Sequence, residues 1–285
     1  MRRPKDSAPI NHENVIRRSV AGSVRLGLVS SADNPMKGND AMTIRALVFD
    51  AYGTLYDVQS VRSLAIELCG DKGELVTQLW RLKQLEYSWL RGMMRAYEDF
   101  WPLTRASLEY SLQAAGVAPD PAICDPLMQK YLNLDLHPEA TAALDALGSH
   151  KLAILSNGSP MMLDALVRAS GVADRFTDVI SVDRARSFKP DPACYALVEP
   201  ALGVARDEVL FVSSNGFDVA GAKQFGFKVV RIERAAGAPA PKNSAIGPTE
   251  FFGLIRGRTE HLGQNPDWQV ARLTDLAPLL AEIGR

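Results

Sequence analysis

A single carboxylate, Asp50, ends the apolar run at 44–49 and precedes a turn-forming glycine and a hydroxyl, Gly53 and Thr54. Three further apolar runs are also followed by polar side chains that could take part in chemistry. The four groups are Asp50 with Thr54, Ser156 with Asn157, Lys189, and Ser213 with Asn215 and Asp218. A lone acid at such a junction is usually a turn or cap residue. Four such groups together favour one shared site, because the carboxyl ends of parallel strands meet at one edge of a sheet.

The residue types limit the chemistry that this site can perform. The three cysteines are scattered without CxxC spacing or a nearby histidine cluster, so neither a disulfide framework nor a zinc site is indicated. The four histidines lie outside all of the strand ends, which weakens a Ser-His or Cys-His mechanism. Carboxylates must therefore act if the protein is a hydrolase.

A parallel α/β sheet is the fold that would position these groups. Five short apolar runs without strict alternation are typical of strands covered on both faces. These runs are 44–50, 151–156, 178–182, 208–213 and 227–232. Helical stretches lie between the last four of them, so we predict a Rossmann-like parallel sheet with helices on both faces. The chain should close with a short amphipathic helix at 273–283.

A helical insert separates the first two predicted strands. Residues 73–133 show helical periodicity, which places Leu79, Leu82, Leu85, Trp89 and Met93 on related faces. We expect a cap domain at 58–137 and a core domain at 42–57 and 138–285. Because the insert leaves from the carboxyl end of the first strand, it can close over the site.

Composition indicates an ordinary soluble protein that acts on small molecules. Of its 285 residues, 47% are apolar and 23% charged, and the formal net charge is −1. This gives no pull toward nucleic acid, and no run is long enough to span a membrane. Residues 1–41 are polar, and Arg25 interrupts what would otherwise be a weak signal-peptide core. We therefore expect a disordered extension and a cytoplasmic protein, with an export signal as the alternative.

Six segments together resemble the haloacid dehalogenase superfamily, and more narrowly its (S)-2-haloacid dehalogenases. The segments are "FDAYGTLYDV", "LWRLKQLEYSWLR", "LAILSNGSP", "KPDPACY", "LFVSSNGFD" and "GQNPDW". The resemblance covers about residues 43–285, and the second and fifth segments are its most selective motifs. It implies a haloacid dehalogenase core, a helical cap, a homodimer and no metal or other cofactor.

The first and fifth segments separate this resemblance from the phosphatases of the same superfamily. The first motif of those enzymes is DxDxT, in which the second Asp acts as a general acid. This chain has Tyr52 at that position. They also hold Mg²⁺ through acidic residues, whereas "SSNGFD" offers only Asp218 as a carboxylate. Both differences suit a halide leaving group, which needs no proton.

The resemblance implies roles for the polar groups. Asp50 would displace halide from the α-carbon and form a covalent ester, while Lys189 keeps it ionised and Thr54 orients it. Arg81 would receive the halide, because a guanidinium is always charged and only weakly hydrated. The substrate carboxylate would bind Ser156 and the backbone of Asn157 at a helix N-terminus.

The remaining matched positions would line the pocket or organise the hydrolytic water. Pocket positions are Tyr52, Leu85, Phe100 and Phe217, and water positions are Ser213, Asn215, Asp218 and Tyr195. Without the resemblance, each has a plainer interpretation: core packing for the apolar residues, helix capping for "SSN", and a solvated arginine for Arg81 beside Gln84 and Ser88. Asp218 and Lys189 are coupled candidates for taking the proton of the water.

The predicted function is hydrolysis of short (S)-2-haloalkanoic acids to (R)-2-hydroxy acids and halide, with small-molecule substrate, water and halide as partners. One alternative is ring opening of an azetidine-2-carboxylate-type substrate by the same ester route. Others are a Mg²⁺-dependent phosphatase and an inactive anion-binding module. Two departures from the family leave substrate range and assembly open: Gly216-Phe217 in place of Ala-Trp, and a long stretch at 235–262 whose beginning reads as a loop to residue 248.

Overall fold

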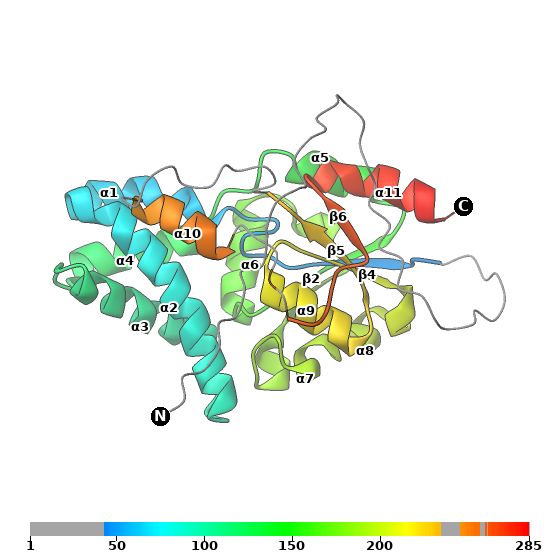
Figure 1. The fold of residues 1–285 in the computed structure, drawn as a ribbon, viewed down its shortest axis with the longest axis horizontal. Helices are drawn as coiled ribbons and strands as arrows, with labels where there is room; N and C mark the ends of the chain where they lie inside the picture. Colours follow the sequence, from blue (N-terminus) through cyan, green and yellow to red (C-terminus); the bar gives the residue numbers. More distant parts are fainter. Residues whose placement is uncertain (1–42, 235–245, 257–259, 261, 285) are drawn as a thin grey trace, which may run out of the picture. The chain divides into compact units, whose positions relative to one another are not determined.

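A six-stranded parallel β-sheet carries the site in the computed structural model, which describes residues 43–234, 246–256, 260 and 262–284 (Figure 1). The strand order is β3-β2-β1-β4-β5-β6. The strands are β1 (Ala46–Phe49), β2 (Lys151–Ser156), β3 (Asp178–Ser181), β4 (Val209–Ser213), β5 (Lys228–Ile232) and β6 (Trp268–Val270). Phe49 pairs with Ile154 on β2 and with Val212 on β4. The residues that follow these three strands therefore come level at one edge of the sheet.

All five predicted strands are confirmed, with ends that differ by at most two residues. The side chains of β1 and β4 are buried throughout and those of β2 and β5 in all but their first residue, as expected where helices cover both faces, whereas the first two residues of β3 are half-buried. The sixth strand, β6, was not predicted. It has only three residues, lies at the edge, and carries an exposed glutamine in its middle, so it lacks the apolar run that marks the other strands.

Helices lie on both faces of the sheet. Figure 1 shows α5 and α11 on one side and α7, α8 and α9 on the other. The helices of this part are α5 (Ala140–Ala146), α6 (Pro160–Ala169), α7 (Pro192–Tyr195), α8 (Val198–Leu202), α9 (Gly216–Phe225) and α11 (Leu276–Ile283). Short 3-10 helices are η1 (Val58–Val61), η2 (Gly70–Lys72), η3 (Ala173–Arg175), η4 (Val182–Ala185), η5 (Arg206–Glu208) and η6 (Leu273–Asp275). The closing helix at 273–283 is confirmed as η6 followed by α11.

Five α-helices lie between β1 and β2, and we call the first four of them, α1 to α4, the inserted helices. They are α1 (Arg62–Cys69), α2 (Gly73–Met93), α3 (Phe100–Ala114) and α4 (Pro121–Tyr131). Carboxylates cap two of them: Asp99 Oδ1 accepts from Trp101 N at 2.6 Å, and Asp120 Oδ1 accepts from Ala122 N at 2.8 Å. The helical prediction for 73–133 is confirmed, and α1 extends it toward β1. The assignment of 58–137 as a separate cap domain stays a prediction.

The buried face of α2 differs from the predicted one. The expected apolar face ends at Met93, which is 74% exposed. Of the predicted set, Leu85 is buried, and the residues that pack inside beside it are Trp80 and the polar residues Gln84 and Ser88. The plainer interpretation of Arg81 as a solvated arginine is wrong, because its side chain is buried on this same face. A polar stripe on α2 therefore faces the interior.

Helix α10 (Pro248–Arg256) joins the two parts of the structure and was not predicted. It follows β5 in the chain, yet it packs against α2 of the inserted helices (Figure 1). Thr249 Oγ1 accepts a hydrogen bond from Gln78 Nε2 at 3.2 Å and donates one to Glu74. Most of the predicted loop at 235–248 lies outside the described residues, and α10 begins at its last position.

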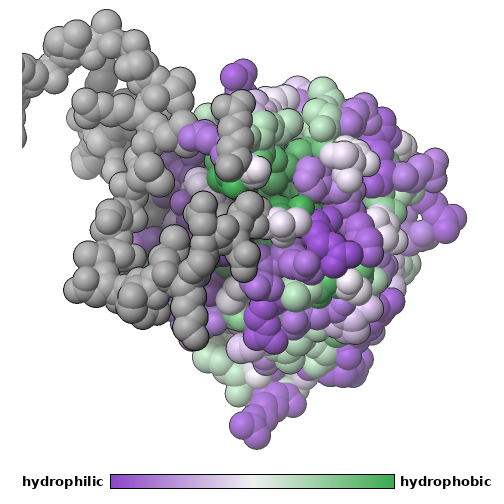
Figure 2. Space-filling view, turned by 90° about the vertical axis from the view of Figure 1, so that its right-hand side faces the viewer, coloured by the Kyte–Doolittle hydropathy of each residue, from purple (hydrophilic) through white to green (hydrophobic). Residues whose placement is uncertain are grey.

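The surface is mixed in character. On the face in Figure 2, hydrophilic residues surround smaller groups of hydrophobic ones. Every helix among the described residues is too short or too polar to span a membrane.

Candidate active site

Asp50 is the first residue after β1, and three side chains hold its carboxylate. Oδ2 accepts from Thr54 Oγ1 at 3.0 Å and from Asn215 Nδ2 at 2.7 Å, whereas Oδ1 accepts from Lys189 Nζ at 3.2 Å. Gly53 makes this arrangement possible, because its φ of +90° turns the chain so that Thr54 points back toward Asp50. The carboxylate is only 6% exposed and has a fixed orientation.

Lys189 lies between two carboxylates in the interior. Its Nζ is 3.2 Å from Asp50 Oδ1 and 3.0 Å from Asp218 Oδ2, and its side chain is 1% exposed. Burial alone would lower the pKa of Lys189, but the attraction of Asp218 and Asp50 raises it, so the amine stays charged. Burial raises the pKa of Asp218 to about 6, against the opposing effect of Lys189. The site thus holds one ammonium group, that of Lys189, between the carboxyl groups of Asp50 and Asp218.

Tyr195 also belongs to this buried network, through a hydrogen bond to Asp218. Its hydroxyl donates to Asp218 Oδ1 at 2.8 Å. Burial and the neighbouring Asp218 raise the pKa of Tyr195 well above its ordinary value, so the phenol remains a donor. Ser213 accepts from Asn215 N at 3.1 Å and so shapes the turn that presents the Asn215 amide.

The end of β2 supplies hydrogen-bonding groups on the other side of Asp50. Ser159 caps α6, and Pro160 occupies its first turn, as the sequence predicts. Ser156 Oγ accepts from Gly158 N at 3.2 Å and keeps its own hydrogen for donation. The side chain of Asn157 accepts from Lys189 N at 3.0 Å, which ties this loop to the lysine.

The inserted helices contribute Arg81, Leu85 and Phe100. The Arg81 guanidinium is 7% exposed and donates to Gln84 Oε1 at 2.8 Å and to the carbonyl of Tyr52 at 3.3 Å. Among the described residues, no carboxylate pairs with it. A buried guanidinium that has only neutral partners keeps an uncompensated charge, which an anion could balance.

Ten of the predicted site residues line one small cavity of about 10 Å³. They are Asp50, Tyr52, Arg81, Leu85, Phe100, Ser156, Asn157, Lys189, Asn215 and Phe217. Thr54, Ser213, Asp218 and Tyr195 do not line it but are connected to it through the hydrogen bonds described above. The structure therefore brings all of the predicted residues together.

Aromatic packing fixes the apolar wall of this cavity. Tyr52 stacks on Tyr131 with ring centroids 5.5 Å apart and lies 6.3 Å from Phe100. The rings of Phe217 and Trp89 are tilted by 75° to each other, with their centroids 5.1 Å apart. Burial raises the pKa of Tyr52 well above its ordinary value, so its phenol is a poor proton donor to a leaving group.

Three residues that the prediction did not include also support the site. Tyr131 donates to Gln84 Oε1 at 2.8 Å, so Gln84 is held in the orientation that meets Arg81. Ser214 N donates to Thr54 Oγ1 at 2.9 Å, which fixes the hydroxyl that orients Asp50. Gln84 and Ser214 stand inside the quoted motifs, whereas Tyr131 lies in no motif and is located only by packing.

The groups around the Asp50 carboxylate suit the ammonium group of Lys189 better than a divalent cation. Asn215 Nδ2 donates both to Asp50 Oδ2 and to the carbonyl of Tyr52 at 3.0 Å. A hard cation at this position would need both oxygens as ligands. No group of three or more potential metal ligands occurs in the described part of the chain.

Comparison with known proteins links this geometry to a family. Residues 44–226 match the family described as haloacid dehalogenase-like hydrolase. An (S)-2-haloacid dehalogenase of Xanthobacter autotrophicus is 49% identical over 240 residues, which cover 83% of this chain and 95% of the relative. Haloacetate dehalogenase H-2 of Moraxella sp. (strain B) is 40% identical over 240 residues, covering 84% and 98%.

Solved structures agree with this match. The structure of L-2-haloacid dehalogenase from Xanthobacter autotrophicus has a TM-score of 0.79 and 48% identity, and covers 84% of this chain and 99% of that one. A structure of the same enzyme with chloropropionic acid covalently bound has a TM-score of 0.77 and 47% identity, with the same coverage.

Proposed function

This chain belongs to the haloacid dehalogenase-like hydrolases, and we propose that it hydrolyses short (S)-2-haloalkanoic acids to (R)-2-hydroxy acids and halide. The observation that carries the proposal is the buried site itself, where Asp50 and Arg81 line one cavity and Arg81 has no carboxylate partner among the described residues. Relatives named for haloacids support it and do not favour the ring-opening alternative.

Ester formation begins with attack by Asp50. Oδ2 accepts from both Thr54 and Asn215, whereas Oδ1 accepts only the longer bond from Lys189 Nζ at 3.2 Å, so we assign Oδ1 as the oxygen that attacks the α-carbon. The new C–O bond forms as the carbon–halogen bond breaks, and the halide departs with the bonding electrons. Attack from the rear inverts the centre, which gives an R product from an S substrate. The covalent chloropropionic acid in a related structure supports this ester route.

Binding groups orient the substrate for this attack. We assign the substrate carboxylate to the Ser156 hydroxyl and the Asn157 backbone at the start of α6, and the departing halide to Arg81. Leu85, Phe100, Tyr52 and Phe217 would exclude bulk water from the reacting carbon. A dry cavity strengthens the attraction between Arg81 and the developing halide charge.

Hydrolysis of the ester regenerates Asp50. A water attacks the ester carbonyl, so its oxygen enters the Asp50 carboxylate and the bond to the alcohol oxygen breaks. One proton of this water passes to the pair formed by Asp218 and Lys189, which lies within hydrogen-bond distance of Asp50, and the other ends on the alcohol oxygen of the departing 2-hydroxy acid. Asn215 and Ser213 hold the neighbouring turn, and Tyr195 holds Asp218.

Halide release from the two enantiomers of 2-chloropropionate tests the proposal. We expect chloride release from the S form alone, in the presence of a chelator, with (R)-lactate as the product. A parallel assay with phosphate esters and Mg²⁺ tests the phosphatase alternative. Activity that appears only in the second assay would overturn the proposed function.

We further propose a cytoplasmic homodimer, as the resemblance implies. Exposed apolar side chains near the end of α2, including Met93 at 74% and Met94 at 62% exposure, are candidates for burial in such a dimer. Sedimentation equilibrium should give twice the mass of one chain, and a monomer at micromolar concentration would contradict the assembly.

A further inference from the structure

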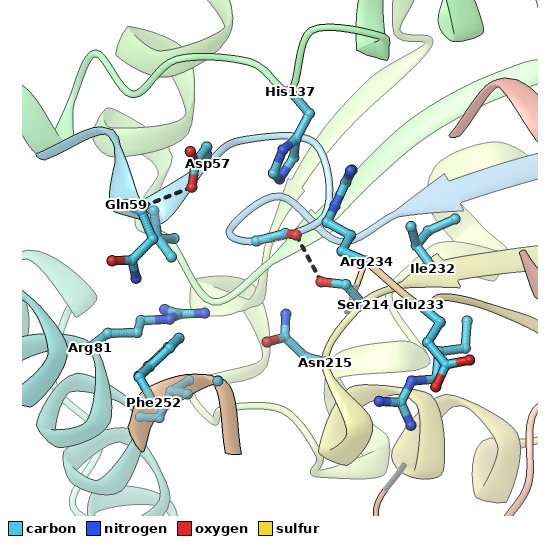
Figure 3. A pocket seen from close by; sticks show the side chains of 15 residues that line it. Asp57, Gln59, Arg81, His137, Ser214, Asn215, Ile232, Glu233, Arg234 and Phe252 are labelled. Carbon is cyan, nitrogen blue, oxygen red and sulfur yellow. Dashed lines mark hydrogen bonds between the residues drawn. The ribbon is translucent and has the colours of Figure 1, made fainter. Parts of the chain in front are cut away.

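A second, larger cavity adjoins the catalytic one. Its volume is about 250 Å³, against about 10 Å³ for the cavity at Asp50. Arg81, Leu85 and Asn215 line both cavities and form the wall between them. In Figure 3 the side chains of Arg81, His137 and Asn215 approach one space from different elements, with Phe252 of α10 beside Arg81. We call this second space the antechamber.

The antechamber has the charge character of an anion site. Three guanidinium groups line it, against two carboxylates, Asp57 and Glu233, and one of the three, Arg234, is paired with Glu139. One oxygen of Asp57 already has a donor, because its Oδ1 accepts the backbone N–H of Gln59 at 2.8 Å. Arg81, as described above, has only neutral partners among the described residues.

His137 adds a polar atom that its surroundings leave unused. Its Nε2 is buried, and it has no hydrogen-bond partner among the described residues. The backbone of His137 is fixed, since its N–H donates to the carbonyl of Leu55 at 2.9 Å. A buried nitrogen without a partner, beside a cavity that charged side chains also line, is a candidate contact for a ligand.

The sizes of the two cavities show why such a site is useful. A cavity of about 10 Å³ has room for roughly one water. A 2-haloacid therefore enters only after side chains in the wall move, whereas the antechamber can hold it in the present conformation. The antechamber also reaches the surface, because Arg234 and Gly253 in its lining are exposed.

We propose that the antechamber is a second binding site for a small monovalent anion, which is held by Arg81 and His137 on its way to or from Asp50. The inference rests on the proposed function, which supplies two anions of this class, the incoming 2-haloacid and the outgoing halide. Because Arg81 and Asn215 line both cavities, the anion remains in contact with them as it moves from one cavity to the other.

Anion binding beside His137 is coupled to proton uptake. Burial and the neighbouring Arg234 lower the pKa of His137, while Asp57, Glu139 and a hydrogen bond to the backbone of Gly53 act in the opposite direction. Arg234 is itself paired with Glu139 at 2.7 Å. A bound anion would favour the charged imidazole, so binding at this site should tighten as the pH falls.

Bromide and lactate, each added alone to crystals of the full chain, test the inference directly. We expect an anomalous bromide peak, or lactate density, in the antechamber within contact distance of His137 Nε2 and the Arg81 guanidinium. Either anion at this position supports the site, and the two arms tell the halide from the carboxylate. Neither anion there, at concentrations that fill the cavity at Asp50, would overturn it.

Inhibition by bromide tests the same site in solution. His137→Leu should raise the inhibition constant of bromide about tenfold, as expected for the loss of one charge-assisted hydrogen bond. In the unaltered protein this constant should fall between about pH 8 and about pH 5.5, and His137→Leu should remove most of that fall. His150→Leu is the matched control, because the His150 ring bonds only to Ser149 among the described residues and lies outside both cavities.

The outcomes separate this inference from the proposed function. Chloride release with no anion in the antechamber, and with an unchanged bromide constant in His137→Leu, would refute the antechamber alone. An anion bound there in a protein that releases no chloride would refute the dehalogenase and leave the site standing.

Discussion

Removal of one buried hydroxyl, by Tyr195→Phe, should move the pH dependence of the reaction rather than abolish it. Tyr195 donates to Asp218 Oδ1 at 2.8 Å, and neither side chain is exposed to water that could replace the bond. A hydrogen bond to a charged group contributes about 1.5–3 kcal/mol, and one pKa unit corresponds to about 1.4 kcal/mol. The pKa of Asp218, about 6 in the intact protein, should therefore rise by about one to two units.

The sign of this effect follows from the role proposed for Asp218. Its ionised form takes part in hydrolysis of the ester, so activity is lost as the pH falls through its pKa. A higher pKa means that the loss begins at a higher pH. The rate at alkaline pH should stay close to that of the unaltered protein, because Asp218 is then ionised in both.

The assay is chloride release from (S)-2-chloropropionate across the pH range, for Tyr195→Phe and for a control, Tyr56→Phe. Tyr56 is equally buried, but its hydroxyl bonds to Ser170 at 2.9 Å, away from Asp218. The control should leave the acid limb of the profile in place. A uniform fall of the rate in Tyr195→Phe, with no displacement of that limb, would refute the reasoning and indicate that the phenol acts through packing.

Three further substitutions test other parts of the site. Asp50→Asn should lower halide release at least about a thousandfold, and single turnover in ¹⁸O-water should label Asp50 only in the unaltered protein. Arg81→Lys should slow ester formation about 10- to 100-fold in rapid-quench experiments, because an ammonium is more strongly hydrated; an unchanged rate would argue against halide binding there. Gly221→Ala should lower both kcat and Tm, because its Cβ would lie 2.5 Å from the Tyr195 hydroxyl. Gly92→Ala is the control, since nothing lies within 4 Å of its Cβ, and it should raise the stability by about 0.5–1 kcal/mol.

The sequence by itself determined the sheet and the chemistry at its edge. Continuous apolar runs define strands that are covered on both faces, and a parallel sheet brings the ends of those strands to one edge. Asp50, Ser156 and Asn215 could therefore be placed together before any packing was known. The motif around Arg81 added the inserted helices to the same site.

Tertiary structure decided what local periodicity does not contain. The polar face of α2 is buried because Thr104 and Tyr131 of neighbouring helices bond to Gln84, and such partners are distant in the sequence. Strand β6 forms because its three residues pair with the exposed edge of β5. The antechamber exists because α10 returns from the sheet to pack on α2, which places Phe252 beside Arg81 and opposite His137. A linear pattern records which residues are apolar, but the contacts between distant segments decide where a cavity remains and which charges line it.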